Sequence, residues 1–343
     1  MISFRNDYSE GACPEIIEAM VASNVDQHVG YGEDECCEAA KKAIKNVLEY
    51  ENCDIHFLVG GTQANLTVIA SILRPYEAVI AVDSGHINVH ETGSVEATGH
   101  KVVIADGIDG KLSVEGIRKA VKKHEDEHMV KPAMIYISNA TEIGTIYHKA
   151  ELQALREVCD ELGLYLFMDG ARLGAALSAE DNDVEFDDLC KYCDVFYIGG
   201  TKNGALFGEA VVIVNDDLKK NFRYMIKQHG GMLAKGWLLG TQFQVLFEQG
   251  LYLSSAKHAN VLAQKMQEGM LKLGIPFFIQ TTTNQIFPIL KNEVIQELQK
   301  SYAFQVWEKI DDTATAMRFV TSWATKEEDV DRFLKDISSI VQG

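Results

Sequence analysis

The sequence predicts an α/β fold with a large domain built on a mainly parallel sheet, followed by a smaller α+β domain. Short apolar runs that suit buried strands alternate with helical segments from residue 55 to about residue 215, which is typical of a parallel sheet covered by helices on both faces. Beyond residue 215 helical periodicity dominates, and further strands then follow. With 343 residues, about two domains are expected. We predict an N-terminal arm over 1–13, a large domain over 14–249 and a small domain over 250–343.

Composition limits the classes of partner. The formal net charge of −18 argues against a nucleic-acid or anionic-membrane partner. Residues 1–7 lack the apolar core of a signal peptide, and no apolar run of 18 residues occurs. The seven cysteines are an odd number without the spacing of a secreted disulfide framework. These features predict a cytoplasmic protein with reduced thiols, and Cys190-Lys191-Tyr192-Cys193 is interpreted as the end of a helix, so no metal site is predicted.

The elements of the large domain follow from local patterns. Pro14 suits the first turn of a helix that runs to about residue 23, and Glu33 with Asp34 favours the start of a second helix over 35–50. The apolar runs predict strands at 55–59, 78–82, 101–104, 133–138, 164–168, 195–198 and 211–214. Helices are expected between them at 66–73, 114–124 and 151–162.

In the last third of the chain, helical periodicity extends from 218 to 273 and is interrupted at Gly230-Gly231. Strands are then predicted at 277–280, 285–290, 302–308 and 316–322, with helices at 294–300 and 327–341.

Polar residues follow the carboxyl ends of five predicted strands, which is where open α/β sheets bind ligands. They are Gly60 to Thr62, His86, Asn139 to Glu142, Asp169 with Arg172, and Lys202. Their convergence predicts one site at this edge of the sheet.

Lys202 and Asp169 indicate the chemistry of that site. A lysine on a Gly-flanked strand end can present its amine to a bound aldehyde, and an aspartate can hold a protonated ring nitrogen, the two contacts that pyridoxal 5'-phosphate requires. Gly60, Gly61 and Thr62 open a helix whose N–H groups and dipole favour a phosphate. Each residue taken alone also has a structural interpretation, Lys202 as a solvated turn residue and Asp169 as a helix N-cap.

Arg318 stands in an apolar strand, where an arginine needs an anionic partner. Either a substrate carboxylate or one of the chain's many acidic residues can serve.

Motifs over nearly the whole length resemble those of low-specificity L-threonine aldolases, in the β-eliminating lyase group of fold-type I, aspartate-aminotransferase-like enzymes that use pyridoxal phosphate. The resemblance rests on Arg5-Asn6-Asp7, Val29-Gly30-Tyr31-Gly32-Glu33-Asp34, Gly61-Thr62-Gln63-Ala64-Asn65, His86 with Glu91, Asp169-Gly170-Ala171-Arg172, Thr201-Lys202-Asn203-Gly204, His229-Gly230-Gly231-Met232 and Arg318.

The resemblance implies a role for each matching residue. Lys202 would bind the cofactor covalently, Asp169 would pair with the pyridine nitrogen, and His86 would stack on the ring. The phosphate would be held by Gly60, Gly61 and Thr62 with help from Lys235, and the substrate carboxylate by Arg172 and Arg318, with Asn6 of the arm nearby. Family members are homodimers or homotetramers with shared active sites, to which Tyr31 and Lys235 are the candidate contributors from the neighbouring subunit.

Three positions depart from the family pattern. Asn6 stands where the arm usually has serine, Thr201-Lys202-Asn203 replaces Ser-Lys-Gly, and Glu142-Ile143 replaces a His-Asn pair. The family histidine lies near the substrate's β-hydroxyl group, so Glu142 is a candidate catalytic residue and a candidate determinant of the substrate. His86, Glu142 or a water that they hold could be the general base.

The predicted function is cleavage of a β-hydroxy-α-amino acid of the L-threonine or L-allo-threonine type to glycine and an aldehyde. The alternative keeps the cofactor but performs β-elimination or transamination on another amino acid. A third possibility is a protein without catalytic activity on the same fold, against which the presence of both Lys202 and Asp169 argues.

Overall fold

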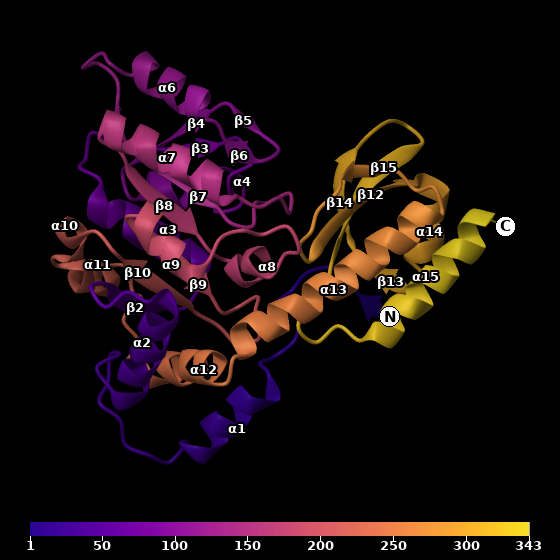
Figure 1. Ribbon diagram of the computed structural model, residues 1–343, viewed down its shortest axis with the longest axis horizontal. Helices are drawn as coiled ribbons and strands as arrows, with labels where there is room; N and C mark the ends of the chain where they lie inside the picture. The colour runs from indigo at the N-terminus through magenta and orange to yellow at the C-terminus, as the bar shows by residue number, and fades with distance from the viewer. Residues whose placement is uncertain (343) are drawn as a thin grey trace.

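The computed structural model describes residues 1–342 and contains a seven-stranded sheet, a four-stranded sheet and two two-stranded pairs. The large sheet with its helices and the smaller domain lie side by side (Figure 1). The long helix α13 (Leu251–Lys272) runs from one to the other.

The large sheet consists of β2 (Asp54–Leu58), β3 (Glu77–Val82), β4 (Lys101–Ala105), β7 (Lys131–Ser138), β8 (Tyr165–Asp169), β9 (Val195–Gly199) and β10 (Glu209–Ile213). Their order is β2-β10-β9-β8-β7-β3-β4. Strand β10 is antiparallel to both of its neighbours, whereas the other pairs are parallel. The predicted mainly parallel sheet is thus confirmed. The strand predicted at 211–214 begins earlier, at Glu209, because this acidic residue is buried within the sheet.

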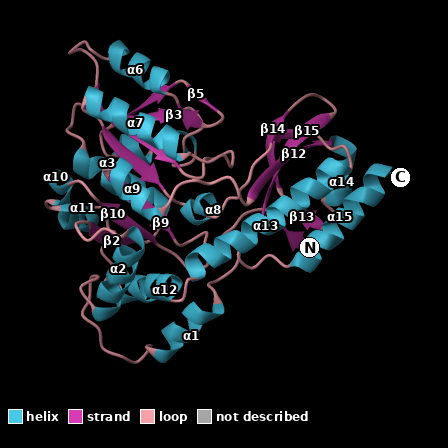
Figure 2. Ribbon diagram, in the orientation of Figure 1, coloured by secondary structure: helices cyan, strands magenta, loops and turns pink. Residues whose placement is uncertain are grey.

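Helices cover both faces of this sheet (Figure 2). They are α1 (Pro14–Ala22), α2 (Glu35–Leu48), α3 (Gly61–Ile72), α4 (His86–Val89), α5 (Ser94–Ala97), α6 (Val114–Lys123), α7 (Lys149–Leu162), α8 (Leu173–Leu177), α9 (Phe186–Tyr192), α10 (Asp216–Lys219), α11 (Phe222–Gln228) and α12 (Trp237–Glu248); a short hairpin joins β5 (Gly107–Ile108) to β6 (Lys111–Leu112). Helix α3 begins at Gly61 rather than Leu66, because Ala64 N–H already donates to the Gly60 carbonyl.

Alternate side chains of the strands enter separate hydrophobic cores. On one face, Ala210 and Val212 of β10 pack with residues of α2 and α12. On the other face, Val211 and Ile213 pack with Val68 and other residues of α3. The side chain of an odd-numbered residue of β10 therefore points towards α3.

The small domain has an antiparallel sheet in the order β11-β12-β15-β14. Its remaining elements are β11 (Phe277–Ile279), β12 (Gln285–Lys291), α14 (Asn292–Leu298), β13 (Tyr302–Ala303), β14 (Gln305–Lys309), β15 (Ala314–Val320) and α15 (Glu327–Gln342). The single strand predicted at 302–308 is two strands, because the intervening Phe304 turns into the small-domain core.

The N-terminal arm connects the two domains. Strand β1 (Ile2–Ser3) pairs in parallel with β13, and Phe4 is buried in the small-domain core. By Cys13 the chain has reached the large domain, where its N–H donates to the Gly204 carbonyl. The division at residues 13 and 249 stays a prediction.

The cysteines and the helices bear on two general expectations. All seven cysteines are free thiols. Among residues 1–342, no helix combines the length and apolar character needed to cross a membrane.

Candidate active site

A cavity of about 440 Å³ lies at the carboxyl ends of the parallel strands, and Arg318 of the small domain also borders it. The predicted site residues that line it are Gly60, Gly61, Thr62, His86, Glu142, Asp169, Arg172, Lys202 and Arg318. The residues of the large domain meet here because parallel strands bring their carboxyl ends to one edge of the sheet, and β15 of the small domain adds Arg318.

The first turn of α3 forms one wall of the cavity. The N–H groups of Gly61 and Thr62 make no hydrogen bond within residues 1–342, and the twelve-residue helix directs its positive dipole end towards them. A Cβ atom on Gly61 would lie 2.9 Å from the Tyr197 hydroxyl oxygen, so glycine is needed for this close approach. Free amides beside a positive helix end suit a phosphate group.

Asp169 ends β8 and is held by three donors. Its Oδ2 accepts from Tyr136 Oη at 2.5 Å and from Asn65 Nδ2 at 3.0 Å, and its Oδ1 accepts from Ala171 N–H at 2.9 Å. Burial opposes ionisation, but the charge of nearby His86 and the Tyr136 hydrogen bond outweigh it and lower the pKa of Asp169. The residue is therefore a carboxylate at neutral pH, fit to face a protonated ring nitrogen.

His86 opens α4, and its Nδ1 lies 2.7 Å from Oε1 of the buried Glu91. Burial lowers the pKa of His86, but the Glu91 hydrogen bond and the charges of Glu142 and Asp169 together raise it above its usual value. Glu91 also accepts from Asn65 and Ser94, which fixes the orientation of the imidazole ring. The raised pKa favours the protonated ring, in which both nitrogens are donors.

Lys202 follows β9, and its amine makes no hydrogen bond or ion pair with any residue of 1–342. Burial and the positive charge of Arg172 lower the pKa of Lys202. A lowered pKa favours the neutral amine, which is the nucleophilic form. The lysine is therefore free to react with an aldehyde.

Arg172 is committed to a partner that the sequence-based prediction did not assign. Its Nε donates to Asp7 Oδ2 at 2.8 Å and its Nη2 to Asp7 Oδ1 at 3.1 Å, and both side chains are buried. Only Nη1 lacks a hydrogen bond within residues 1–342. The role of Arg172 in binding the substrate carboxylate stays a prediction, and it now depends on Nη1 alone.

Arg318 has no acidic partner among residues 1–342. Its Nη1 donates to Gln285 at 3.4 Å and its Nη2 to Gln305, while Nε is buried without a partner. Burial and the charge of Arg172 lower the pKa of Arg318, a sign that this cation is incompletely compensated. Of the two partners considered from sequence, these contacts favour a substrate anion.

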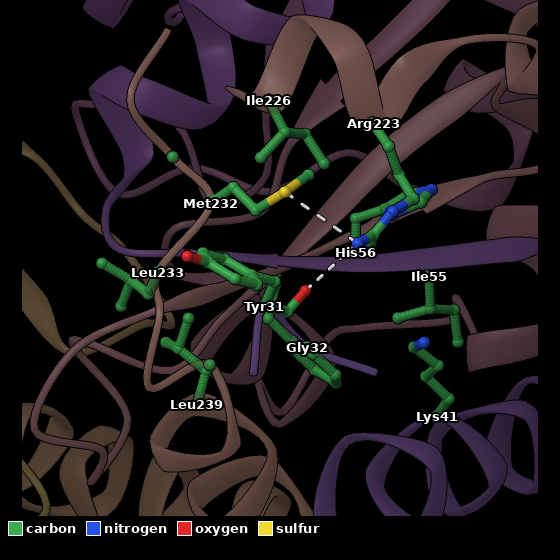
Figure 3. Close-up of a pocket in the computed structure, with 13 residues that line it drawn as sticks. Tyr31, Gly32, Lys41, Ile55, His56, Arg223, Ile226, Met232, Leu233 and Leu239 are labelled. Carbon is green, nitrogen blue, oxygen red and sulfur yellow. Dashed lines mark hydrogen bonds between the residues drawn. The ribbon is translucent and has the colours of Figure 1, made fainter. Parts of the chain in front are cut away.

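Three predicted residues do not line this cavity. Asn6 stabilises the arm instead, since its Oδ1 accepts from Tyr8 N–H and Ser9 Oγ. Lys235 is exposed on the loop before α12. Tyr31 lies in a separate pocket beside Met232 and Leu233, where Arg223 donates to its carbonyl oxygen (Figure 3).

The structure adds cavity residues that sequence reasoning missed: Tyr8, His90, Tyr197, Phe207 and Glu209. It also places Thr201 in the cavity, a residue quoted above only as part of the lysine motif. His90 and Glu209 each carried a signal, a second histidine one helical turn after His86 and an acidic residue at the start of an apolar run. The others carry no distinguishing pattern.

The donor set fits pyridoxal 5'-phosphate. Lys202 offers a free amine for the aldehyde, Asp169 a carboxylate for the ring nitrogen, and α3 uncommitted amides for the phosphate.

The Asp7–Arg172 pair allows a prediction for stability. Asp7→Asn leaves a buried guanidinium without its anion and should lower the free energy of unfolding at pH 7 by about 3 kcal/mol. Burial raises the pKa of Asp7, but Arg172 outweighs it and lowers the pKa below 3.8. The stabilisation is therefore complete above this value and lost as the pH falls through the folded-state pKa.

Urea unfolding measures this effect. The difference in unfolding free energy between wild type and Asp7→Asn should be smaller below pH 4 than at pH 7. The exposed control Asp26→Asn should change the stability little, and equal effects of the two variants would contradict the prediction.

Comparison with known proteins agrees with this geometry. The family model described as Beta-eliminating lyase matches residues 3–293. A low specificity L-threonine aldolase of Pseudomonas sp. (strain NCIMB 10558) is 31% identical over 342 residues, covering 98% of this chain and 97% of the relative.

Two solved structures extend the comparison. The structure of a Leishmania major threonine aldolase is 47% identical, with a TM-score of 0.98 and coverage of 99% of this chain and 100% of that chain. A Thermus thermophilus aspartate aminotransferase is 14% identical with a TM-score of 0.73, covering 99% and 91%, and shows the shared fold alone. The resemblance drawn from the motifs is confirmed, and the chain belongs to the β-eliminating lyase family.

Proposed function

We propose that the protein uses pyridoxal 5'-phosphate to cleave β-hydroxy-α-amino acids of the L-threonine type to glycine and an aldehyde. The observation that carries the proposal is that the uncommitted amine of Lys202 and the carboxylate of Asp169 line one cavity. The names of the Pseudomonas and Leishmania relatives point to the same activity.

Each end of the cofactor has a counterpart in the cavity. Gly61 and Thr62 would hold the phosphate, Lys202 would present its amine to the aldehyde, and Asp169 would keep the pyridine nitrogen protonated. When bound, the cofactor supplies an electron sink that stabilises negative charge on the substrate's Cα. His86 would pack on the ring, and its hydrogen bond to Glu91 fixes the orientation of the imidazole.

The substrate carboxylate is held by Arg318, with the free Nη1 of Arg172 as a second donor. Fixing the carboxylate would restrict the rotation of the bound substrate, so that one bond to Cα is presented for cleavage. This is catalysis by orientation.

A base must take the proton from the β-hydroxyl group as the Cα–Cβ bond breaks. The raised pKa of His86 and its hydrogen bond to Glu91 favour the protonated ring, and a protonated ring cannot serve as the base. The Glu142 side chain makes no hydrogen bond within residues 1–342 and faces the same cavity, as does His90, whose pKa is lowered by burial. We assign the base to Glu142, or to a water that it shares with His90.

The activity can be tested directly. The purified protein with cofactor should release glycine and acetaldehyde from L-threonine or L-allo-threonine. Lys202→Ala should lose both this cleavage and the visible absorption of the covalently bound cofactor, because no other amine is available in the cavity. The exposed control Lys220→Ala should retain both. Formation of 2-oxobutyrate or ammonia without glycine would indicate the alternative, β-elimination or transamination.

Arg318 gives a second prediction. Arg318→Gln should raise the KM for threonine by about 10- to 100-fold, the value of a charge-assisted hydrogen bond, while cofactor affinity should change little. Steady-state kinetics and cofactor titration measure the two effects, with the exposed Arg332→Gln as the matched control. If both affinities fall equally, Arg318 has a structural role instead.

We also propose a homodimer or a homotetramer built from two dimers, in the cytoplasm. Tyr31 is 47% exposed and Lys235 is exposed, and neither lines its own chain's cavity, which supports a role in the neighbouring subunit's site. The seven free thiols suit a reducing compartment.

Shared sites predict complementation. Mixing unfolded Lys202→Ala and Lys235→Ala chains and refolding them together should restore roughly a quarter of wild-type activity, because half of the dimers are mixed and each mixed dimer has one intact site. Mixing Lys202→Ala with Asp169→Ala should restore none, since these residues belong to the same chain's site. Absence of recovery in the first mixture would place Lys235 outside the shared site.

A further inference from the structure

The proposed mechanism leaves one buried carboxyl group without a role. Glu209 is the first residue of β10, lines the active-site cavity and is 3% exposed. Its Oε1 accepts from Thr201 Oγ1 at 3.1 Å. Its Oε2 is buried and has no hydrogen-bond partner within residues 1–342. A carboxyl group placed in this way lacks one expected contact.

No cation neutralises Glu209. Among the described residues, no cation forms an ion pair with Glu209 within 4.0 Å. The charge of Lys202 lowers the pKa of Glu209 from a longer distance. Burial is the dominant effect and, with the like charge of Asp169, outweighs Lys202 and the Thr201 hydrogen bond, raising the pKa of Glu209 to about 8.

No other titratable group named around Glu209 supplies a positive charge that would lower its pKa again. Burial raises the pKa of Tyr197 on β9 and of Tyr252 on α13, so both phenols are neutral, and burial lowers the pKa of His56 on β2 to about 3. The first turn of α3 contains no acidic side chain. At neutral pH Glu209 therefore carries a proton.

The position of Glu209 relates it to the start of α3. It pairs with Leu58, two residues before Gly60, and it has the same strand parity as Val211 and Ile213, which pack on the α3 face. The free N–H groups of Gly61 and Thr62 border the same cavity. A protonated carboxyl group there can supply a further donor to an anion held by these amides.

We propose that Glu209, in its protonated form, donates a hydrogen bond from Oε2 to the phosphate monoester bound at the first turn of α3. The identity of this anion as the cofactor's phosphate rests on the proposed function. Once ionised, the side chain would repel the phosphate and could no longer donate. Cofactor binding is consequently linked to retention of one proton and weakens at alkaline pH.

Pyridoxine 5'-phosphate is the probe for this proposal, because it carries the phosphate but no aldehyde and cannot react with Lys202. Its affinity for the cofactor-free protein is measured by calorimetry from pH 6.5 to 9.5. In the wild type the Kd should rise about tenfold for each pH unit above about 8, as one linked proton requires.

Glu209→Gln supplies a permanent neutral donor of the same shape. It should bind pyridoxine 5'-phosphate at pH 7 with nearly wild-type affinity and lose the steep alkaline dependence. Because Lys202 and Glu209 interact, the substitution can also change the ionisation of Lys202, and pyridoxine without phosphate serves as the control for that effect. Pyridoxine without phosphate should show no difference in pH dependence between them. The same pH dependence of pyridoxine 5'-phosphate binding in wild type and variant would overturn the proposal.

A measurement on the wild type alone keeps the test independent of the variant's folding. Titrations at pH 8.5 in two buffers of different ionisation enthalpy should show more proton uptake when pyridoxine 5'-phosphate binds than when pyridoxine binds, since both ligands carry the ring nitrogen that Asp169 would face. Equal uptake for the two ligands would overturn the proposal. The result is separate from the proposed function: an enzyme that cleaves threonine can lack this linkage, and a phosphate site with this linkage can exist in an enzyme that does not cleave threonine.

Discussion

Asp7 is the buried carboxylate on which the active-site wall depends. It accepts two hydrogen bonds from Arg172 of the large domain and one, at 2.9 Å, from Asn284 of the small domain. The arm that carries Asp7 is anchored at Phe4, whose carbonyl accepts from Val320 N–H. One side chain thus connects arm, large domain and small domain where the cavity lies, so the placement of Arg318 relative to Lys202 depends on a contact outside both sheets. Because the pair is buried, removing either charge leaves the other uncompensated in a medium of low dielectric constant.

The charges inside the cavity explain how an acidic protein can receive two anions. The chain carries a net charge of −18, yet Arg172, Arg318 and Lys202 all border the cavity. Two of the three guanidinium nitrogens of Arg172 already donate to Asp7. Donors without a partner therefore remain mainly on Arg318, for a carboxylate, and at the start of α3, for a phosphate. The global charge is carried elsewhere and has little bearing on local recognition, since interactions between exposed charges are screened beyond about 10 Å.

The sequence allowed us to predict which residues follow the carboxyl ends of the strands. It did not allow us to predict the partners that depend on contacts between distant segments. The alternation of apolar runs placed Asp169 and Lys202 at one edge of a parallel sheet, because that geometry follows from topology alone. It could not foresee that Arg172 would pair with Asp7, 165 residues away, since an ion pair between distant segments leaves no local pattern. Glu209 was left out of the predicted strand because its local pattern was misleading. An acidic side chain is normally exposed, and Glu209 is buried because it lines the cavity.

The distribution of hydrogen-bond partners separates the supporting residues of the site from the reactive ones. Asp169 and Glu91 each accept three hydrogen bonds, and groups held in this way are fixed in place. Lys202 and Glu142 make none within residues 1–342, and Nε of Arg318 and Oε2 of Glu209 are buried without partners. Leaving a buried polar group unpaired costs about 1–3 kcal/mol, so a cavity that concentrates such groups is stabilised when a ligand completes them. Binding energy is thereby available where the chemistry takes place, on a frame that does not have to rearrange to provide it.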